Sequence, residues 1–301
     1  MITPAMIKEL REQTGAGFGD VKSALTEANG NMEEATKILR KKGLAAASKK
    51  AGRVTAEGAV VAHVAGATGV LVEVNCETDF VGRNENFRAF AEDVAKAVAS
   101  SSAESVDDFL SETWPGSDET VSQKVAEQIA SIKENISVRR FARYQSPENA
   151  VIGTYIHGGG KIGVMVEVVG TGEGVTNEIA KDIAMHIAAA EPRFLSREDV
   201  TQKDLDTERE IARDAAAKSG KPDNIVEKMV QGKMEKFYGE ACLLEQPYIR
   251  DDKSTVTQYL QRRGKECGCE FLVTRFTRYK LGEGIEKKSE DFAAEVASYM
   301  K

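Results

Sequence analysis

Two stretches with the pattern of buried strands divide the chain into repeats. Residues 69–74 (GVLVEV) are dense in β-branched residues, and nearly the same sequence returns 94 residues later, at residues 163–168 (GVMVEV). The amphipathic pattern of residues 90–96 (FAEDVAK) predicts a helix and returns after only 89 residues, at residues 179–185 (IAKDIAM). The core is therefore a duplicated unit, and the first copy carries five extra residues between its strand and its helix.

The strand that closes the repeat also occurs twice. Residues 140–144 (RFARY) return 135 residues later, at residues 275–279 (RFTRY), so the second copy holds 46 more residues than the first before this strand. The two copies predict an α+β fold with two small subdomains, each an antiparallel sheet that helices cover on one face. The predicted subdomains comprise residues 59–146 and 147–283.

The pattern that precedes the repeat is helical. Residues 1–42 predict three short helices, in which Thr3, Asp20 and Asn31 occupy the positions of N-terminal caps. Three helices in so few residues form a marginal miniature bundle. Residues 43–58 are basic and rich in alanine and glycine, which favours a linker between the bundle and the duplicated core; a partly helical linker is compatible with the same residues.

The extra residues of the second copy form a charged helical pattern. Residues 201–219 and 223–237 predict two helices that make an antiparallel helical hairpin, about 201–237. The apolar stripe of its first arm is thin, so we expect the hairpin to project as a contact arm; the alternative is a solvated pair packed on its own subdomain. Residues 284–301 predict a C-terminal module with one short helix.

Composition fits a globular protein and disfavours two kinds of partner. Of the 301 residues, 41% are hydrophobic and 30% charged, and the net charge is −7. An acidic chain with only 6% aromatic residues is a poor binder of nucleic acid, which requires basic charge and stacking platforms. Because no apolar run approaches the ~20 residues of a membrane helix and no secretory signal is visible, we expect a cytoplasmic protein without membrane contact.

Side chains that carry catalysis or bind metals lack the necessary spacing. The chain has no Gly-x-x-x-x-Gly-Lys-[Ser/Thr] phosphate-binding sequence, and its three histidines are scattered. Among the four cysteines only Cys267 and Cys269 are close in sequence, so we expect buried, inert thiols rather than a zinc site or a disulfide framework. We therefore expect neither an enzyme nor a cofactor.

The residues added to the first copy coincide with a short loop. Thr78, Asp79, Phe80 and Val81 follow the first repeated strand and place an aromatic ring beside a carboxylate. Loops on a rigid scaffold often carry binding residues, so an addition to one copy alone indicates contact with another molecule. The alternative is an aromatic ring folded beneath its own helix.

Two segments resemble a known protein family. Residues 10–25 (LREQTGAGFGDVKSAL) and residues 73–81 (EVNCETDFV) are similar to the two signatures of bacterial translation elongation factor Ts, the guanine-nucleotide exchange factor for elongation factor Tu. Both segments are long and specific. The resemblance covers essentially the whole chain, and it implies a ubiquitin-associated-like (UBA-like) helical domain, a linker, a duplicated core, a helical hairpin and a carboxy-terminal module.

The resemblance implies how Asp79 and Phe80 act. In the family this pair enters the nucleotide-binding domain of elongation factor Tu in its GDP-bound form, displaces helices near the bound magnesium and loosens the coordination of the metal. GDP then leaves, and GTP rebinds. Thr78 and Val81 flank the pair. Gly82 replaces a more usual Ser or Ala, which implies a more flexible loop.

Four further positions match family residues that contact elongation factor Tu. They are Phe18, Lys22, His157 and Ile249. Many members have a bulky apolar residue where this chain has Gly19, so the contact made by the helical domain is expected to be weaker here.

Two other functions are compatible with the residues. One is a UBA-like adaptor that binds its partner without exchange activity, and the other is an enzyme that binds a small molecule in a cleft of the duplicated core. Neither function needs the loop of Asp79 and Phe80. For the assembly, a homodimer and a two-to-two complex with elongation factor Tu both stay open.

Overall fold

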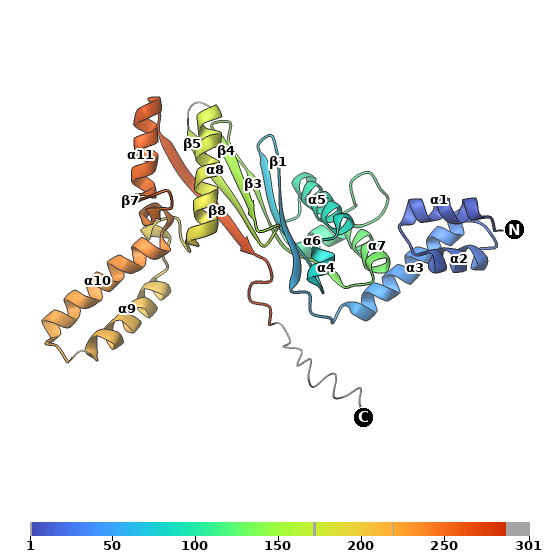
Figure 1. Cartoon of the computed structure of the whole chain (residues 1–301), viewed down its shortest axis with the longest axis horizontal. Coiled ribbons are helices and arrows are strands. Elements are labelled where there is room, and N and C mark those ends of the chain that lie inside the picture. Colours follow the sequence, from blue (N-terminus) through green and yellow to red (C-terminus); the bar gives the residue numbers. More distant parts are fainter. Residues whose placement is uncertain (1, 171–172, 219, 287–301) are drawn as a thin grey trace. The chain divides into compact units, whose positions relative to one another are not determined.

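The structure is a computed structural model that describes residues 2–170, 173–218 and 220–286 (Figure 1). The helix predicted near the C-terminus and most of the predicted module 284–301 lie outside these residues. Helices and short sheets alternate along the chain, which confirms the predicted α+β class. The chain forms two compact units; the first comprises the chain up to Val61, Val72–Phe141 and the chain from Lys280, and the second comprises Ala62–Leu71 and Ala142–Tyr279.

Three helices begin the first unit and enclose a small apolar core. They are α1 (Pro4–Thr14), α2 (Phe18–Glu27) and α3 (Met32–Lys50). The predicted caps Thr3 and Asn31 are confirmed, because each side chain accepts a hydrogen bond from the backbone N–H three residues later. The predicted cap Asp20 is wrong. Gly17 is the residue that precedes α2. Asp20 lies in the first turn, where its negative charge interacts favourably with the positive end of the helix dipole.

Helix α3 continues into the segment that was predicted as a linker. Residues 44–47 (LAAA) have high helix propensity. Gly43 allows a close approach to α7 (Val121–Ile132), since a Cβ at Gly43 would lie 3.5 Å from the Cβ of Ala130. Packing against α7 stabilises an end that would fray in an isolated helix. Only residues 51–56 form an irregular connection to the first strand.

The first sheet has the strand order β1-β2-β3. Its strands are β1 (Glu57–Ala65), β2 (Thr68–Cys76) and β3 (Ile136–Gln145). The helices between β2 and β3 are α4 (Asp79–Gly82), α5 (Glu85–Ser100), α6 (Val106–Ser111) and α7. The predicted amphipathic helix is confirmed as α5, which buries Phe87, Val94 and Val98. The short helix α6 was not predicted.

The second sheet repeats the first, with the strand order β4-β5-β8. Its strands are β4 (Ala150–His157), β5 (Ile162–Gly170) and β8 (Phe271–Lys280). β4 and β5 pair antiparallel, with Gly153 opposite Val166. Helix α8 (Glu173–Ala190) lies so close to this pair that a Cβ at Gly153 would be 2.6 Å from the carbonyl oxygen of Ala180. The predicted helix-covered sheet is therefore present.

The predicted helical hairpin is confirmed. It consists of α9 (Gln202–Ala217) and α10 (Asp223–Ala241). Its buried side chains form a cluster between the two helices, which contains Ala212, Ala216, Val230 and Met234. Ile211, on α9, is 57% exposed. Near the base of the hairpin, Arg193 pairs with Asp204 at 3.0 Å and Arg197 pairs with Glu235 at 2.7 Å.

A helix that was not predicted extends the repeat. α11 (Val256–Cys267) precedes β8 as α7 precedes β3, and the two helices match end to end at the 135-residue offset of the closing strands. Thr120 and Thr255 begin them with capping boxes, and both helices end at a left-handed residue, Lys133 and Gly268. The remaining elements are η1 (Arg197–Asp199), η2 (Leu243–Glu245), β6 (Pro247–Tyr248) and β7 (Asp251–Thr255).

In the part of the chain that the structure describes, every helix is too short or too polar to cross a bilayer. Cys76 and Cys242 are buried, as expected, but Cys267 is exposed and Cys269 half-buried. The expectation of buried thiols is therefore wrong for this pair. The reason is local: the two residues flank Gly268, at the turn that ends α11 and leads into β8.

Candidate protein-binding site

The added residues of the first copy form α4, a single helical turn between β2 and α5. Thr78 caps this turn, because its hydroxyl oxygen accepts a hydrogen bond from the N–H of Val81 at 3.4 Å. Phe80 is 83% exposed, which makes it the most exposed large apolar side chain in the described residues. The alternative of a ring folded beneath its own helix is therefore wrong. The exposed ring is accessible to another molecule, and aromatic side chains are enriched at protein interfaces.

Asp79 lies beside this ring and is half-buried. Its carboxylate pairs with Arg83 at 2.9 Å, one turn further along the chain. An exposed ion pair of this kind contributes little stability and exchanges readily for another partner. The Asp79 carboxylate is thus oriented, yet available to a second molecule.

The base of α4 is fixed by a residue that sequence reasoning did not identify. Glu134, between α7 and β3, accepts hydrogen bonds from the N–H of Glu77 at 3.1 Å and from both the N–H and the hydroxyl of Thr78 at 3.0 and 2.6 Å. Cys76 adds a bond from its thiol to the carbonyl of Thr78 at 3.2 Å. Burial, together with the charge of Glu134, raises the pKa of the Cys76 thiol to about 12. This thiol is thus a protonated structural donor.

The other end of α4 is closely packed. Gly82 is buried, and a Cβ at this position would lie 2.9 Å from the carbonyl oxygen of Gly58. A contact so short with backbone requires one of the two segments to move. Gly82 was expected to make the loop more flexible; in the structure its missing side chain also lets α4 pack directly against β1.

Phe18 and Lys22 lie on α2 in the same unit as α4. Phe18 is 56% exposed, and Lys22 is also exposed. The segment that ends α7 joins this helical domain to α4: Ser131 donates to the carbonyl of Gly15 at 2.8 Å, Lys133 pairs with Asp20 at 2.9 Å, and Glu134 holds Thr78. One short segment thus supports both predicted contact regions.

His157 and Ile249 lie in the second unit, on different elements. His157 ends β4, where its Nδ1 is 3.1 Å from the Tyr155 hydroxyl, and three glycines with positive φ follow it in a hairpin turn. Ile249 follows β6 and is 46% exposed, while its N–H donates to Nδ1 of the buried His186 at 3.3 Å. Both positions are exposed, and the structure shows no contact that joins them.

Comparison with known proteins identifies the family. The profile of the family described as Elongation factor TS matches residues 77–283. Elongation factor Ts of Syntrophotalea carbinolica is 51% identical over 303 aligned residues, which cover 100% of this chain and 99% of the relative. Elongation factor Ts of Clostridium perfringens is 51% identical, with 99% and 98% of the two chains covered, and that of Clostridium tetani is 50% identical with both chains fully covered. The chain belongs to the elongation factor Ts family.

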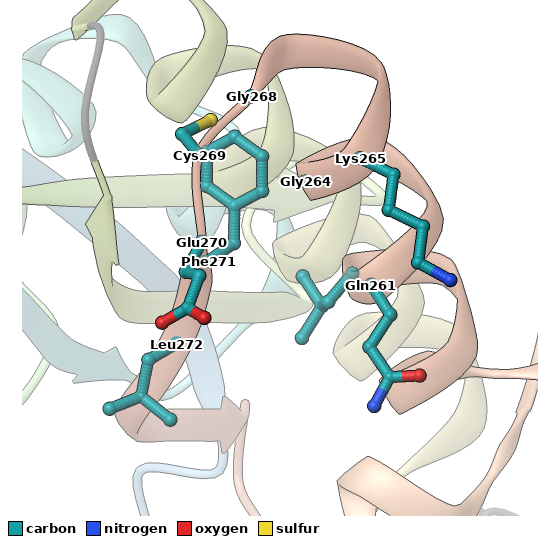
Figure 2. Close-up of a pocket in the computed structure, with 9 residues that line it drawn as sticks. Gln261, Gly264, Lys265, Gly268, Cys269, Glu270, Phe271 and Leu272 are labelled. Atoms are coloured by element: carbon teal, nitrogen blue, oxygen red, sulfur yellow. The ribbon is translucent and has the colours of Figure 1, made fainter.

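A pocket in the second unit is lined by none of the predicted contact residues. It has a volume of about 590 Å³ and lies between the last turns of α11 and the start of β8 (Figure 2). Figure 2 shows Gln261 and Lys265 extending from the helix and Phe271 and Leu272 coming from the strand. The full set of lining residues is Leu260, Gln261, Gly264, Lys265, Gly268, Cys269, Glu270, Phe271 and Leu272.

The repeat explains this pocket. At the 135-residue offset, Gln261 and Lys265 correspond to Ala126 and Ala130 of α7. In the first copy Gly43 of α3 covers these two alanines. A Cβ built at Gly43 would lie 3.6 Å from the carbonyl oxygen of Ala126 and 3.5 Å from the Cβ of Ala130. The second copy carries polar side chains on the same helical face. Within residues 2–170, 173–218 and 220–286, the pocket is therefore the uncovered counterpart of a helix-packing surface.

Proposed function

We propose that this chain is a guanine-nucleotide exchange factor that binds elongation factor Tu in its GDP-bound form and promotes the release of GDP. Membership of the elongation factor Ts family supports the partner and the reaction. The observation that carries the proposal is the presentation of Phe80, which is 83% exposed on a single turn whose two ends are both fixed. A rigidly held, exposed aromatic ring has the properties of an interface anchor.

The proposed mechanism is the insertion of α4 into the nucleotide-binding domain of elongation factor Tu. Phe80 fills an apolar pocket there, and burial of such a side chain contributes about 1.5–3 kcal/mol. Asp79 leaves Arg83 and contacts the same region. Together they displace the helices near the bound magnesium, so the metal and the phosphates lose their coordination.

Exchange then follows from linkage. GDP with magnesium and the exchange factor favour different arrangements of one phosphate site, so each weakens the binding of the other by the same factor. Every ~1.4 kcal/mol of binding free energy that the nucleotide loses when the factor binds weakens nucleotide binding about tenfold. GTP rebinds and releases the factor. The chain thus acts by binding, in the cytoplasm, and needs no covalent chemistry.

Additional contacts come from both units. Phe18 and Lys22 present an aromatic ring and an ammonium group on α2, which shares its support with α4. His157 and Ile249 present a polar and an apolar contact in the second unit. We propose that these four residues add affinity and orient the partner, whereas Asp79 and Phe80 act on its nucleotide site.

Release of a fluorescent GDP analogue from elongation factor Tu tests the proposal. The wild-type chain is expected to accelerate release, and Phe80→Ala is expected to reduce that acceleration at least about tenfold while the partner still binds. An adaptor would bind elongation factor Tu without changing release, and a small-molecule enzyme would do neither. Equal rates for wild type and Phe80→Ala would reject the role of Phe80.

A further inference from the structure

The carboxylate of Glu134 binds the base of α4 from a different part of the chain, between α7 and β3. Its Oε2 accepts from the N–H of Glu77 at 3.1 Å and of Thr78 at 3.0 Å, and its Oε1 accepts from the Thr78 hydroxyl at 2.6 Å. We infer that Glu134 is a positioning residue for exchange: it fixes the base of α4 so that Phe80 is presented to elongation factor Tu. This inference rests on the proposed function.

The Thr78 hydroxyl transmits the effect of Glu134 to the helical turn. A hydroxyl has one proton, and here that proton is donated to Oε1 of Glu134. The oxygen lone pairs are then free to face the N–H of Val81, from which the same hydroxyl accepts at 3.4 Å. Glu134 therefore sets the orientation in which Thr78 caps α4.

The turn depends on such support because it has little of its own. A single helical turn is unfavourable in isolation, since fixing its backbone costs more than its one or two hydrogen bonds return. Phe80 lies in the middle of the turn and, being 83% exposed, packs on little else. The geometry of α4 must therefore come from its ends, from Thr78 on one side and the close packing of Gly82 on the other.

Glu77 and Glu134 each bind the backbone of the segment that carries the other. Glu134 accepts from the N–H of Glu77, and Glu77 in turn accepts from the N–H of Asn135 at 2.6 Å. Arg53 pairs with Glu77 at 3.3 Å, and its carbonyl accepts from the side-chain amide of Asn135 at 3.0 Å. The bends before α4 and before β3 are thus locked together, and the positive charge of Arg53 offsets the repulsion between the two carboxylates.

The repeat provides an independent argument. At the 135-residue offset that superimposes α7 on α11, the position of Glu134 is occupied by Cys269. Each of these residues directly follows the left-handed residue that ends its helix, Lys133 or Gly268. The carboxylate is therefore present in the copy that carries the added loop and absent from the copy that lacks it. A residue needed only for the general fold would be expected in both.

Rates of GDP release at increasing factor concentration test the inference. Glu134→Ala is expected to lower the maximal rate about tenfold, and to cause no further loss when combined with Phe80→Ala, because it acts through that ring. Glu134→Gln keeps an oxygen for the two N–H donors but replaces the acceptor of the Thr78 hydroxyl with an NH2 donor, so it should restore only part of the rate. Glu112→Ala is the matched control: Glu112 also accepts from one N–H and one hydroxyl, both of Ser102 at 3.3 Å, but supports another loop.

Amide hydrogen exchange of the free chain gives a second readout. In Glu134→Ala the amides of Thr78 and Val81 should exchange about tenfold faster, whereas Phe80→Ala and the control should leave them unchanged. Wild-type release rates in Glu134→Ala, an equal loss in the Phe80→Ala background, or unchanged amide exchange would each overturn the inference. If the wild type does not accelerate GDP release, the proposed function fails. The amide hydrogen-exchange rates then still decide whether Glu134 holds the loop.

Discussion

Arg140 donates a hydrogen bond of 2.7 Å from Nε to Oε2 of Glu73, whose side chain is fully buried in the first unit. The residues at the same positions of the second copy, Arg275 and Glu167, are joined at 2.7 Å through Nη2. In each copy the pair connects the strand of the VEV sequence to the closing strand. The duplication has therefore kept a buried ion pair as well as a strand pattern.

Removal of Glu73 should destabilise the protein strongly. Glu73→Ala removes the carboxylate partner of Arg139, leaves Arg140 with Glu283 as its carboxylate partner, and leaves the N–H of Gly282 without its acceptor. Loss of one partner from a buried pair costs about 3–5 kcal/mol. Urea unfolding should show this as a lower midpoint. Asp93→Ala removes the partner of Lys96 from an exposed pair and should leave the midpoint unchanged; equal effects would show that the Glu73 network adds no stability.

The two buried glutamates should make stability depend on pH. Burial opposes the ionisation of Glu73, but hydrogen bonds from Gly282, Arg140 and Arg139 outweigh it and lower its pKa below the ordinary 4.5. The pKa of Glu167 is lowered in the same way, chiefly by Arg275 against the effect of burial. A carboxyl group whose pKa is lower in the folded state stabilises the fold above its unfolded pKa, and this contribution is lost as the pH falls through the folded pKa.

The unfolding free energy should thus decline as the pH falls below about 4.5, the ordinary value for glutamate. The double variant Glu73→Gln with Glu167→Gln should be less stable at neutral pH and should lose less on acidification. Urea unfolding of both proteins at several pH values measures the difference. Parallel pH curves for the two proteins would contradict the assignment.

A methyl group at Gly82 should disturb the presentation of Phe80. In Gly82→Ala the new Cβ would lie 2.9 Å from the carbonyl oxygen of Gly58, so α4 or β1 must move, at a cost of about 1–3 kcal/mol. We expect slower GDP release together with a lower unfolding midpoint. Gly52→Ala is the control, because no atom lies within 4 Å of a Cβ there and Gly52 is not one of the predicted contact residues. Wild-type release in Gly82→Ala would mean that α4 tolerates the displacement.

The helical hairpin should contribute to self-association or to an auxiliary contact with the partner. Ile211 is 57% exposed on α9, while the hairpin already buries its own cluster of Ala212, Ala216, Val230 and Met234. Ile211→Ser removes the exposed apolar surface and should leave the fold intact. Sedimentation equilibrium, with and without elongation factor Tu, compares this variant and a deletion of residues 201–237 with the wild type. The same stoichiometry for all three proteins, with and without elongation factor Tu, would exclude both roles.

Local patterns in the sequence were sufficient for the repeated strands and for several of the helices. The dense apolar run around Glu73 and its copy around Glu167 predicted two central strands, and the cap residues Thr3 and Asn31 predicted where two helices begin. These features depend on neighbours in the chain, such as a side chain three residues from a free N–H. The length difference between the copies likewise placed the added loop correctly.

Long-range packing decided the rest. The extension of α3 past Gly43 depends on its contact with α7, and the role of Glu134 depends on a fold that brings it to Thr78, 56 residues away in the chain. No periodicity marks a single carboxylate after a helix. Likewise Gly82 was expected to loosen the loop, since a glycine in isolation is flexible, whereas the backbone of Gly58 beside it makes the same residue a packing contact. Such contacts join distant segments, and they exist only once the chain has folded.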